Sequence, residues 1–173
     1  MTMIIDEASL DDVPGILAIY NEVLLSSTAI YAEVPVDLAN RIEWFEARRR
    51  HGFPVLVARD GHGIAGYASF GSFRSFPGYR YTVEHSIHIR ADARAQGLGR
   101  RLMEALIPLA RAMGMHAMIA GIDAANEGSI RFHERFGFER VATFPEVGRK
   151  FGRWLDLACM QLFLDPPGSG RPD

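Results

Sequence analysis

A glycine-rich turn between a strand-like and a helix-like segment constrains this chain more than any other feature. Residues 94–102 read RAQGLGRRL; they follow the strand-like residues 84–89 and open a helix-like run that ends at Met113. Glycine lets the backbone approach a ligand closely, and the first N–H groups of a helix have no partner within the helix. These donors and the positive end of the helix dipole suit a phosphate or pyrophosphate. We therefore expect a phosphorylated ligand at this turn.

The spacing of the glycines separates three kinds of nucleotide site. A P-loop needs four residues between its first glycine and a Gly-Lys-[Ser/Thr] triplet, and this segment supplies neither the lysine nor the hydroxyl. The dinucleotide motif Gly-x-Gly-x-x-Gly fails because Gly97-Leu98-Gly99 is followed by two arginines and a leucine. The remaining pattern, Arg-x-x-Gly-x-Gly, resembles the acetyl-CoA motif of the GCN5-related N-acetyltransferase (GNAT) superfamily.

A second segment, about thirty residues further on, strengthens this resemblance. Residues 126–138 read NEGSIRFHERFGF, which is similar to the superfamily's asparagine, short helix and Gly-Phe. Gly137 suits the left-handed residue that ends a helix. The resemblance implies that the turn amides hold the CoA pyrophosphate, that the preceding strand pairs with the pantetheine arm, and that Asn126 bonds a pantetheine amide. The implied acetyl-CoA contacts are Ile87, His88, Ile89, Arg94, Ala95, Gln96, Gly97, Leu98, Gly99, Arg100, Asn126 and Ser129.

Several further segments resemble one branch of the superfamily, the phosphinothricin and methionine sulfoximine N-acetyltransferases. They are residues 19–21, 28–31, 66–69, 82–86 and 147–156, and the likeness extends over roughly residues 3–165. The branch implies small glutamate-like amino-acid substrates that carry a phosphinate, sulfoximine or sulfone group, a detoxifying role and a homodimer. His133 stands where many superfamily members have a tyrosine that is proposed to protonate the CoA thiolate.

Two residues are candidates for the chemistry of acetyl transfer. The amine must lose a proton, and the departing thiolate benefits from gaining one. Glu84 begins the strand before the glycine turn, where a carboxylate can accept the ammonium proton directly or through water. The imidazole of His133 has an ordinary pKa near 6.5 and can serve as acid or base. In the branch that the chain resembles, a glutamate and a histidine at these points have both been assigned catalytic parts.

Glutamate-like substrates need cations for their acidic groups, and the forked donors of arginine suit them best. Arg74, Arg80 and Lys150 are expected in loops near the mouth of the site, with the Arg74 loop as the preferred contact. The predicted substrate-binding residues are Phe73, Arg74, Ser75, Val83, Glu84, His85 and Lys150. A metal is not expected, because His85 and His88 lie three apart on a strand and face opposite sides. Cys159 is expected to be a small core residue.

The order of predicted elements gives a single α/β domain over residues 1–165, followed by a loose tail over residues 166–173. Strands are expected at residues 3–7, 54–59, 64–73, 84–89, 116–122, 138–145 and 154–164, and helices at residues 12–25, 37–51, 98–113 and 129–136. With the resemblance, this order predicts a mixed, mostly antiparallel sheet that is splayed at the acetyl-CoA site. Strand 154–164 reads as buried on both faces. Leu38, Ile42 and Phe45 are expected to point inward, arginines 48–50 to form a solvated helix end, and Pro108 to kink its helix.

Composition excludes several classes of partner. The formal net charge is −2, so no basic field recommends a nucleic acid. No apolar run approaches a membrane span, and the lone cysteine suits a reducing compartment, so we expect a cytoplasmic protein. Two alternatives to the amino-acid acetyltransferase stay open. One acetylates a protein N-terminus, a lysine or a polyamine, although the arginines disfavour a polyamine pocket. The other is a non-catalytic acyl-CoA sensor, which needs the glycine turn but neither Glu84 nor His133.

Overall fold

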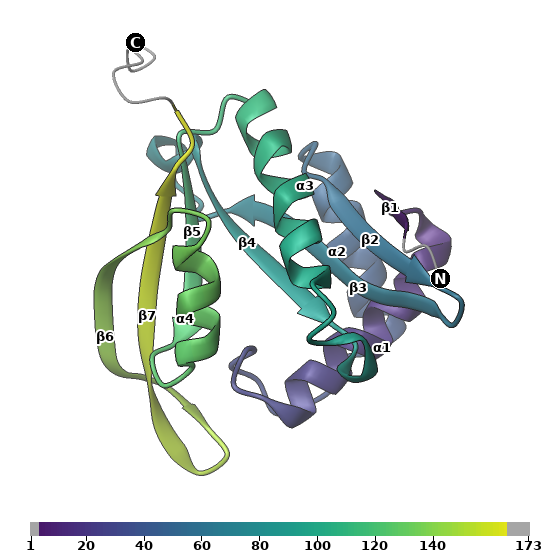
Figure 1. Cartoon of the computed structure of the whole chain (residues 1–173), viewed down its shortest axis with the longest axis horizontal. Helices are drawn as coiled ribbons and strands as arrows, with labels where there is room; N and C mark the ends of the chain where they lie inside the picture. The colour runs from purple at the N-terminus through teal and green to yellow at the C-terminus, as the bar shows by residue number, and fades with distance from the viewer. Residues whose placement is uncertain (1–3, 166–173) are drawn as a thin grey trace.

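Helices cover both faces of one seven-stranded sheet in the computed structural model, which describes residues 4–165 (Figure 1). The strands are β1 (Ile4–Glu7), β2 (Val55–Asp60), β3 (Gly63–Ser72), β4 (Thr82–Ile89), β5 (Ala117–Asp123), β6 (Glu139–Lys150) and β7 (Arg153–Phe163). The α-helices are α1 (Val13–Ser26), α2 (Leu38–Arg50), α3 (Leu98–Ala112) and α4 (Glu127–Glu134). The predicted fold class, a mostly antiparallel mixed sheet with four flanking helices, is confirmed.

The sheet divides at its centre. The strand order is β1-β2-β3-β4-β5-β7-β6, and every neighbouring pair is antiparallel except β4 and β5. These two parallel strands, joined through α3, pair only from Thr82 to Glu84 on β4 and from Ala117 to Ile119 on β5. Beyond those positions they diverge, as Figure 1 shows. The later part of β4 therefore presents backbone groups to a wedge-shaped opening instead of to a neighbouring strand.

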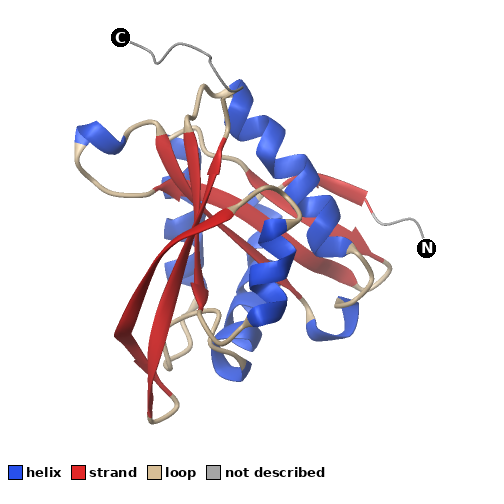
Figure 2. Ribbon diagram, turned by 60° about the vertical axis from the view of Figure 1, so that its left-hand side comes forward, coloured by secondary structure: helices blue, strands red, loops and turns tan. Residues whose placement is uncertain are grey.

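Each face of the sheet has its own apolar core. Side chains of α3 and α4 pack with one face around Leu102, Leu106 and Met118, whereas α1 and α2 cover the other face around Ile16, Phe45 and Tyr67. Figure 2 shows the hairpin of β6 and β7 extending away from this layered body. Because successive side chains of a strand point to opposite faces, β4 contributes to both sides of the sheet. Val83 and Ile87 enter the α3 core, and Glu84 faces the side of α1 and α2.

Local sequence explains how the helices begin and end. Asp37 caps α2 by accepting a hydrogen bond from the Asn40 backbone N–H at 2.9 Å, and Asn126 caps α4 by accepting one from the Ser129 N–H at 3.0 Å. Gly114, in the left-handed region at φ 72°, follows the end of α3 as expected. The helix continues past Pro108 for four residues, to Ala112.

Three expectations about packing and strand length were wrong, wholly or in part. Strand β7 is buried on one face only, because its alternate residues face away from the core, and Trp154 and Phe163 near its ends are each 60% exposed. On α2, Phe45 is buried and Ile42 packs against the core as expected, but Leu38 is 42% exposed and Arg41 is buried. Strand β6 runs five residues further than predicted, because it continues past two bulges as the edge strand paired with β7. The predicted tail, residues 166–173, lies outside the described residues.

Candidate functional site

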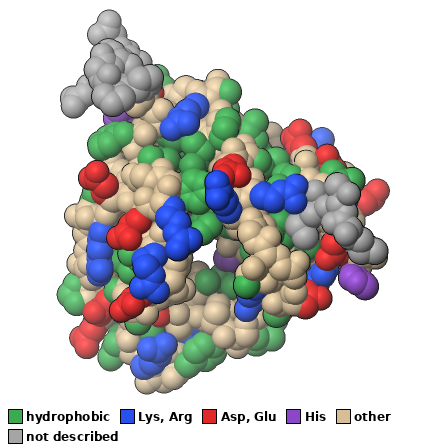
Figure 3. Space-filling view, in the orientation of Figure 1, with side chains coloured by type: hydrophobic (Ala, Val, Ile, Leu, Met, Phe, Trp, Pro, Cys, Tyr) green, Lys and Arg blue, Asp and Glu red, His purple; other side chains and the backbone are tan. Residues whose placement is uncertain are grey.

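A cavity of about 1080 Å³ opens where β4 and β5 diverge. Its walls come from every layer of the fold: α1 and the loop after it, α2, the ends of β3 to β5, the turn before α3, and α4. Figure 3 shows the molecule hollowed on this face, with Lys and Arg side chains around the opening and a histidine visible inside. A cavity of this size in the middle of a splayed sheet can hold an elongated ligand together with a smaller second one.

The glycine turn borders the cavity through Ala95 and Gly99, and it keeps its backbone donors free. Gly97 occupies the N-cap position of α3 in the left-handed region (φ 74°), and Ala95 lies there too (φ 60°), which is uncommon for a residue with a side chain. Unlike α2 and α4, helix α3 has no side-chain cap at its N-terminus. Its first N–H groups are therefore open to an external acceptor. This arrangement matches the phosphate site that the sequence predicts.

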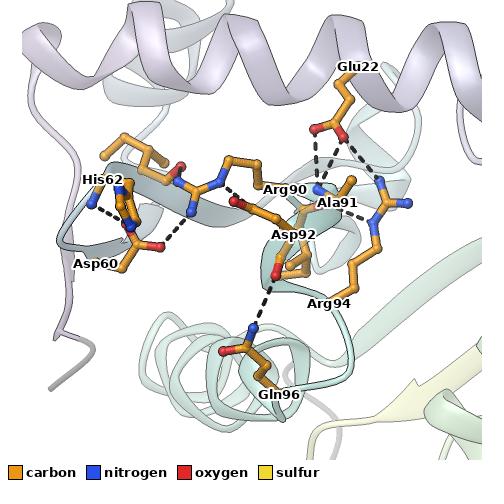
Figure 4. A network of polar contacts seen from close by, with 10 residues as sticks. Glu22, Asp60, His62, Arg90, Ala91, Asp92, Arg94 and Gln96 are labelled. Atoms are coloured by element: carbon orange, nitrogen blue, oxygen red, sulfur yellow. Dashed lines mark hydrogen bonds and ion pairs between the residues drawn. The ribbon is translucent and has the colours of Figure 1, made fainter. Parts of the chain in front are cut away.

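A polar network anchors the segment that leads into this turn (Figure 4). The guanidinium of Arg90 pairs with Asp60 on β2 and with Asp92, each at 2.6 Å. Glu22 on α1 accepts a hydrogen bond from the Ala91 backbone N–H at 3.1 Å and lies 4.0 Å from the guanidinium of Arg94. These contacts join the turn to α1 and β2, so the free amides are held in one arrangement before a ligand arrives.

Glu84 places a carboxylate at the narrow end of the splay. Its side chain lines the cavity, and a Cβ built on Gly121 of β5 would lie 3.2 Å from its Oε1 atom. Burial raises the pKa of the Glu84 carboxyl above its ordinary value, while Arg74 and Arg48 oppose that shift. A carboxylate with a raised pKa, next to the opening that receives the ligand, is suited to accept a proton from a bound amine.

His133 reaches the same cavity from α4, but both of its ring nitrogens are engaged. Its Nδ1 lies 2.7 Å from the Ser129 carbonyl, which can only accept, so Nδ1 carries the hydrogen and donates it. Its Nε2 lies 3.1 Å from Nε2 of His85, which must then be the donor in this neutral pair. The other nitrogen of His85, Nδ1, is buried without a hydrogen-bond partner among the described residues. Whether His133 gives a proton to a thiolate stays a prediction.

Three histidines of the cavity wall should make the fold sensitive to mild acid. Burial, the largest cause, lowers the pKa of His85 to about 3 and of His88 to about 4, and it also lowers that of His133. Below about pH 6.5 the unfolded chain gains protons that the folded chain does not bind, so the free energy of unfolding falls as the pH falls from about 6.5 toward 4. His88→Phe should make this dependence shallower by roughly one proton between pH 7 and 5.

Urea unfolding at several pH values measures the effect of His88→Phe. The control is His62→Gln, in the exposed turn between β2 and β3, which should leave the dependence as it is. Parallel pH dependences for the wild type and His88→Phe would contradict the lowered pKa of His88 in the folded protein.

Most of the predicted residues do line the cavity. They include both catalytic candidates, Glu84 and His133, and His85 from the substrate set. The predicted cofactor residues on the cavity wall are Ile87, His88, Ile89, Arg94, Ala95, Gly99, Asn126 and Ser129. Gln96, Gly97, Leu98 and Arg100 are not on the wall; Leu98 is buried in the α3 core, and Arg100 pairs with Glu104 on the helix surface.

Most of the predicted substrate-binding residues, in contrast, do not line the cavity. Phe73, Arg74 and Ser75 follow β3 and do not line the cavity, although Arg74 influences the pKa of Glu84. Val83 is 1% exposed and packs in the α3 core, because strand alternation turns it away from the face of Glu84. The expectation of Lys150 in a loop at the cavity mouth was wrong. It ends β6, and its ammonium is buried among the carbonyl oxygens of Leu24, Ser27 and Ile30 at 2.5–2.6 Å.

The sequence interpretation missed a group of residues on α2. Arg41, Trp44 and Arg48 line the cavity, spaced so that they share one face of the helix. The spacing of these three residues could have revealed their shared face. Three consecutive arginines, however, are more typical of a solvated helix end, and they are interpreted in that way from the sequence. That expectation holds for Arg49, which is exposed and pairs with Glu46, and fails for Arg48. Asp123 was also missed; its buried carboxylate binds the Thr28 hydroxyl at 2.5 Å and ties the loop after α1 to β5.

Residues 4–165 contain neither a cluster of metal ligands nor a helix that could span a membrane. No group of three or more His, Cys, Asp or Glu side chains is arranged to hold a metal ion in that range. No helix within the same residues has both the length and the apolar character that a membrane crossing requires.

Comparisons with known proteins agree with this geometry. The family model described as "Acetyltransferase (GNAT) family" matches residues 16–138. The L-methionine sulfoximine/L-methionine sulfone acetyltransferase of Pseudomonas paraeruginosa is 55% identical over 98% of this chain and 99% of its own length. A phosphinothricin N-acetyltransferase of Alcaligenes faecalis is 36% identical over 94% of this chain and 83% of its own. The structure of yncA from Salmonella typhimurium with its cofactor acetyl-CoA superposes with a TM-score of 0.95 at 47% identity, covering 100% and 99% of the two chains.

Proposed function

The chain belongs to the acetyltransferase (GNAT) family, and we propose that it transfers the acetyl group of acetyl-CoA to the α-amino group of small, glutamate-like amino acids. The observation that carries this proposal is the position of Glu84 in the cavity that the uncapped N-terminus of α3 also borders. A base and a pyrophosphate site at two points of one cavity are what amine acetylation from acetyl-CoA requires.

The reaction assigns each part of the cavity a task. The free amides of the glycine turn bind the pyrophosphate, and the unpaired edge of β4 aligns the pantetheine arm. Glu84 takes a proton from the substrate ammonium, directly or through water. The neutral amine then attacks the thioester carbonyl and forms the C–N bond. The C–S bond breaks to release the CoA thiolate, which gains the second proton that the acetylated nitrogen loses. Backbone donors of β4 beyond the paired region are available to the developing oxyanion.

The names of the relatives narrow the substrate. Proteins that are 55% and 36% identical are named for methionine sulfoximine and sulfone and for phosphinothricin. All three compounds combine an α-amino acid with a tetrahedral polar group in the side chain, so we propose these as the substrate class and detoxification as the role. Mass spectrometry of a reaction with methionine sulfone should locate one acetyl group on the α-nitrogen. An acetyl group found only on the protein itself, or none at all, would contradict the proposal.

The phosphate assignment predicts a charge effect at Gly97. A Cβ at this position would meet nothing within 4 Å, and both Asp and Asn tolerate its left-handed conformation better than most residues. Gly97→Asp should weaken acetyl-CoA binding about tenfold because it sets a negative charge beside the pyrophosphate. The matched control Gly97→Asn should bind within about twofold of the wild type. Calorimetric titration at low and high salt measures both; equal affinities for the Asp and Asn variants would place the pyrophosphate elsewhere.

We also propose that the protein works as a homodimer in the cytoplasm. A group of about half-exposed apolar side chains on and beside the β6–β7 hairpin supports an interface: Val141, Phe144, Val147, Phe151, Trp154 and Phe163. Exposed apolar patches of this kind are typical of interaction surfaces. Sedimentation should give twice the chain mass of 19.3 kDa for the wild type, and Trp154→Glu with Phe144→Glu should shift it toward the monomer. A wild-type protein that sediments as a monomer would contradict the proposed homodimer.

A further inference from the structure

The guanidinium of Arg48 is an uncompensated cation in the cavity wall. Its Nε atom is buried without a hydrogen-bond acceptor, and no carboxylate within residues 4–165 lies at ion-pair distance from it. Burial lowers the pKa of Arg48 from its ordinary value, and the neighbouring charge of Arg41 lowers it further. A buried donor without a partner is costly in a folded protein. An anionic ligand that accepts a hydrogen bond from this group would remove that cost.

The fold provides a specific place for this side chain. The guanidinium lies against Gly71 at the end of β3, where the Cβ of any other residue would overlap it. It also lies 5.6 Å from the ring of Trp44, and the guanidinium of Arg41 lies 5.0 Å from the same ring. Arg41 is further held 4.1 Å from the Tyr20 ring and by the side-chain oxygen of Asn40. Of the two arginines, Arg41 therefore has a hydrogen-bond acceptor in the protein, whereas the Nε atom of Arg48 has none.

Glu84 contributes a carboxylate to the same cavity that Arg48 lines. Each influences the pKa of the other, yet the two form no hydrogen bond or ion pair in the structure. A gap between one cation and one carboxylate is complementary to a zwitterion. In an α-amino acid, the ammonium and the carboxylate are attached to the same carbon, so an ammonium bound at Glu84 sets its carboxylate within a few ångströms of that site.

We propose that Arg48 binds the α-carboxylate of the substrate and thereby selects α-amino acids over simple amines. The inference rests on the proposed function and assigns a residue to one part of its substrate. Arg41 contributes positive charge beside it, and Trp44 forms the apolar floor between the two. Arg74, which is exposed and outside the cavity, is left for the side chain of the substrate.

The test compares methionine sulfone with its α-carboxamide, which keeps the amine and the sulfone but lacks the anion. Calorimetry on the full chain saturated with CoA measures binding of both compounds, so the readout does not depend on turnover. Arg48→Gln should weaken binding of the acid by roughly 10- to 100-fold and leave binding of the amide within about twofold of wild type. Arg48→Lys should fall between the two, because it keeps the charge but loses the fork.

Arg49→Gln is the matched control, since the adjacent arginine is exposed and pairs with Glu46 on the helix surface; it should bind both compounds as the wild type does. Circular dichroism melting verifies that each variant is folded. Equal losses for acid and amide in a folded Arg48→Gln, or no loss for either, would overturn the proposal. If the wild type binds the acid through Arg48 but transfers no acetyl group to it, the carboxylate site stands and the proposed activity fails. If the wild type binds neither compound, both fail.

Discussion

Replacing Glu84 with glutamine is expected to lower kcat about 100- to 1000-fold while the affinity for acetyl-CoA stays within about twofold of wild type. The glutamine keeps the shape of the side chain next to Gly121 but cannot take a proton from the substrate ammonium. The proposed cofactor contacts lie on the glycine turn and on the later part of β4, which this substitution does not touch. Steady-state kinetics with methionine sulfone and calorimetry with acetyl-CoA measure the two quantities separately.

The pH dependence of the Glu84→Gln variant distinguishes a base from a structural residue. Wild-type kcat/KM should rise with pH through the raised pKa of Glu84 and then level off, because the enzyme itself deprotonates the amine. Without the carboxylate, activity should follow the free amine and recover toward high pH. Glu139→Gln, at the exposed start of β6, serves as the control and should behave like the wild type. A Glu84→Gln enzyme with unchanged turnover would remove Glu84 from the mechanism and favour a sensor or another base.

Replacing Lys150 with methionine is expected to lower the free energy of unfolding by about 3 kcal/mol. Lys150 is 1% exposed, and its ammonium donates to three carbonyl oxygens, from Leu24 near the end of α1 and from Ser27 and Ile30 in the loop that follows. Methionine has similar length but no donor, so those carbonyls would lose their partner in a buried place. For a chain of this size, the melting temperature should fall by roughly 6–12 °C.

The Lys150→Met variant also tests the link between stability and the site. Ser27 and Ile30 line the cavity, so release of this loop should raise KM for the amino acid in the fraction that stays folded. Arg149→Gln, one residue earlier on β6 and exposed, is the control and should leave both quantities within experimental error. A melting temperature for Lys150→Met equal to that of the control would show that the three carbonyls bind water as readily as the ammonium.

The regular part of the fold could be predicted because its signals are local. The Asp60–Gly63 turn, the cap at Asp37 and the glycine after α3 depend on neighbouring residues, and the structure has each where the sequence places it. The parts that failed depend on contacts between distant segments. Lys150 appeared to be a loop cation, because nothing near it in sequence reveals that its acceptors lie more than a hundred residues earlier.

In the candidate site, too, the residues that could be predicted belong to local motifs, and those that could not depend on distant contacts. The glycine turn, Asn126 and Glu84 belong to compact motifs, and all three reach the cavity region that the resemblance implies. Arg48 belongs to no motif; it matters only because α2 packs beside the end of β3, where Gly71 leaves room for a guanidinium. The engagement of both His133 nitrogens likewise needs a partner from β4, so a histidine that the sequence offers as a proton donor proves to be held by its neighbours.

Release of the CoA thiol from acetyl-CoA, measured across a panel of amines, tests the proposed activity and the proposed substrate class together. The panel contains methionine sulfoximine, methionine sulfone, phosphinothricin, ordinary amino acids, spermidine and a lysine peptide. Saturable turnover is expected with the glutamate-like analogues, and little turnover with the peptide or the polyamine. Turnover confined to the peptide or spermidine would contradict the proposed class of amino-acid substrates. Acetyl-CoA binding without turnover on any amine would contradict the proposed acetyltransferase activity.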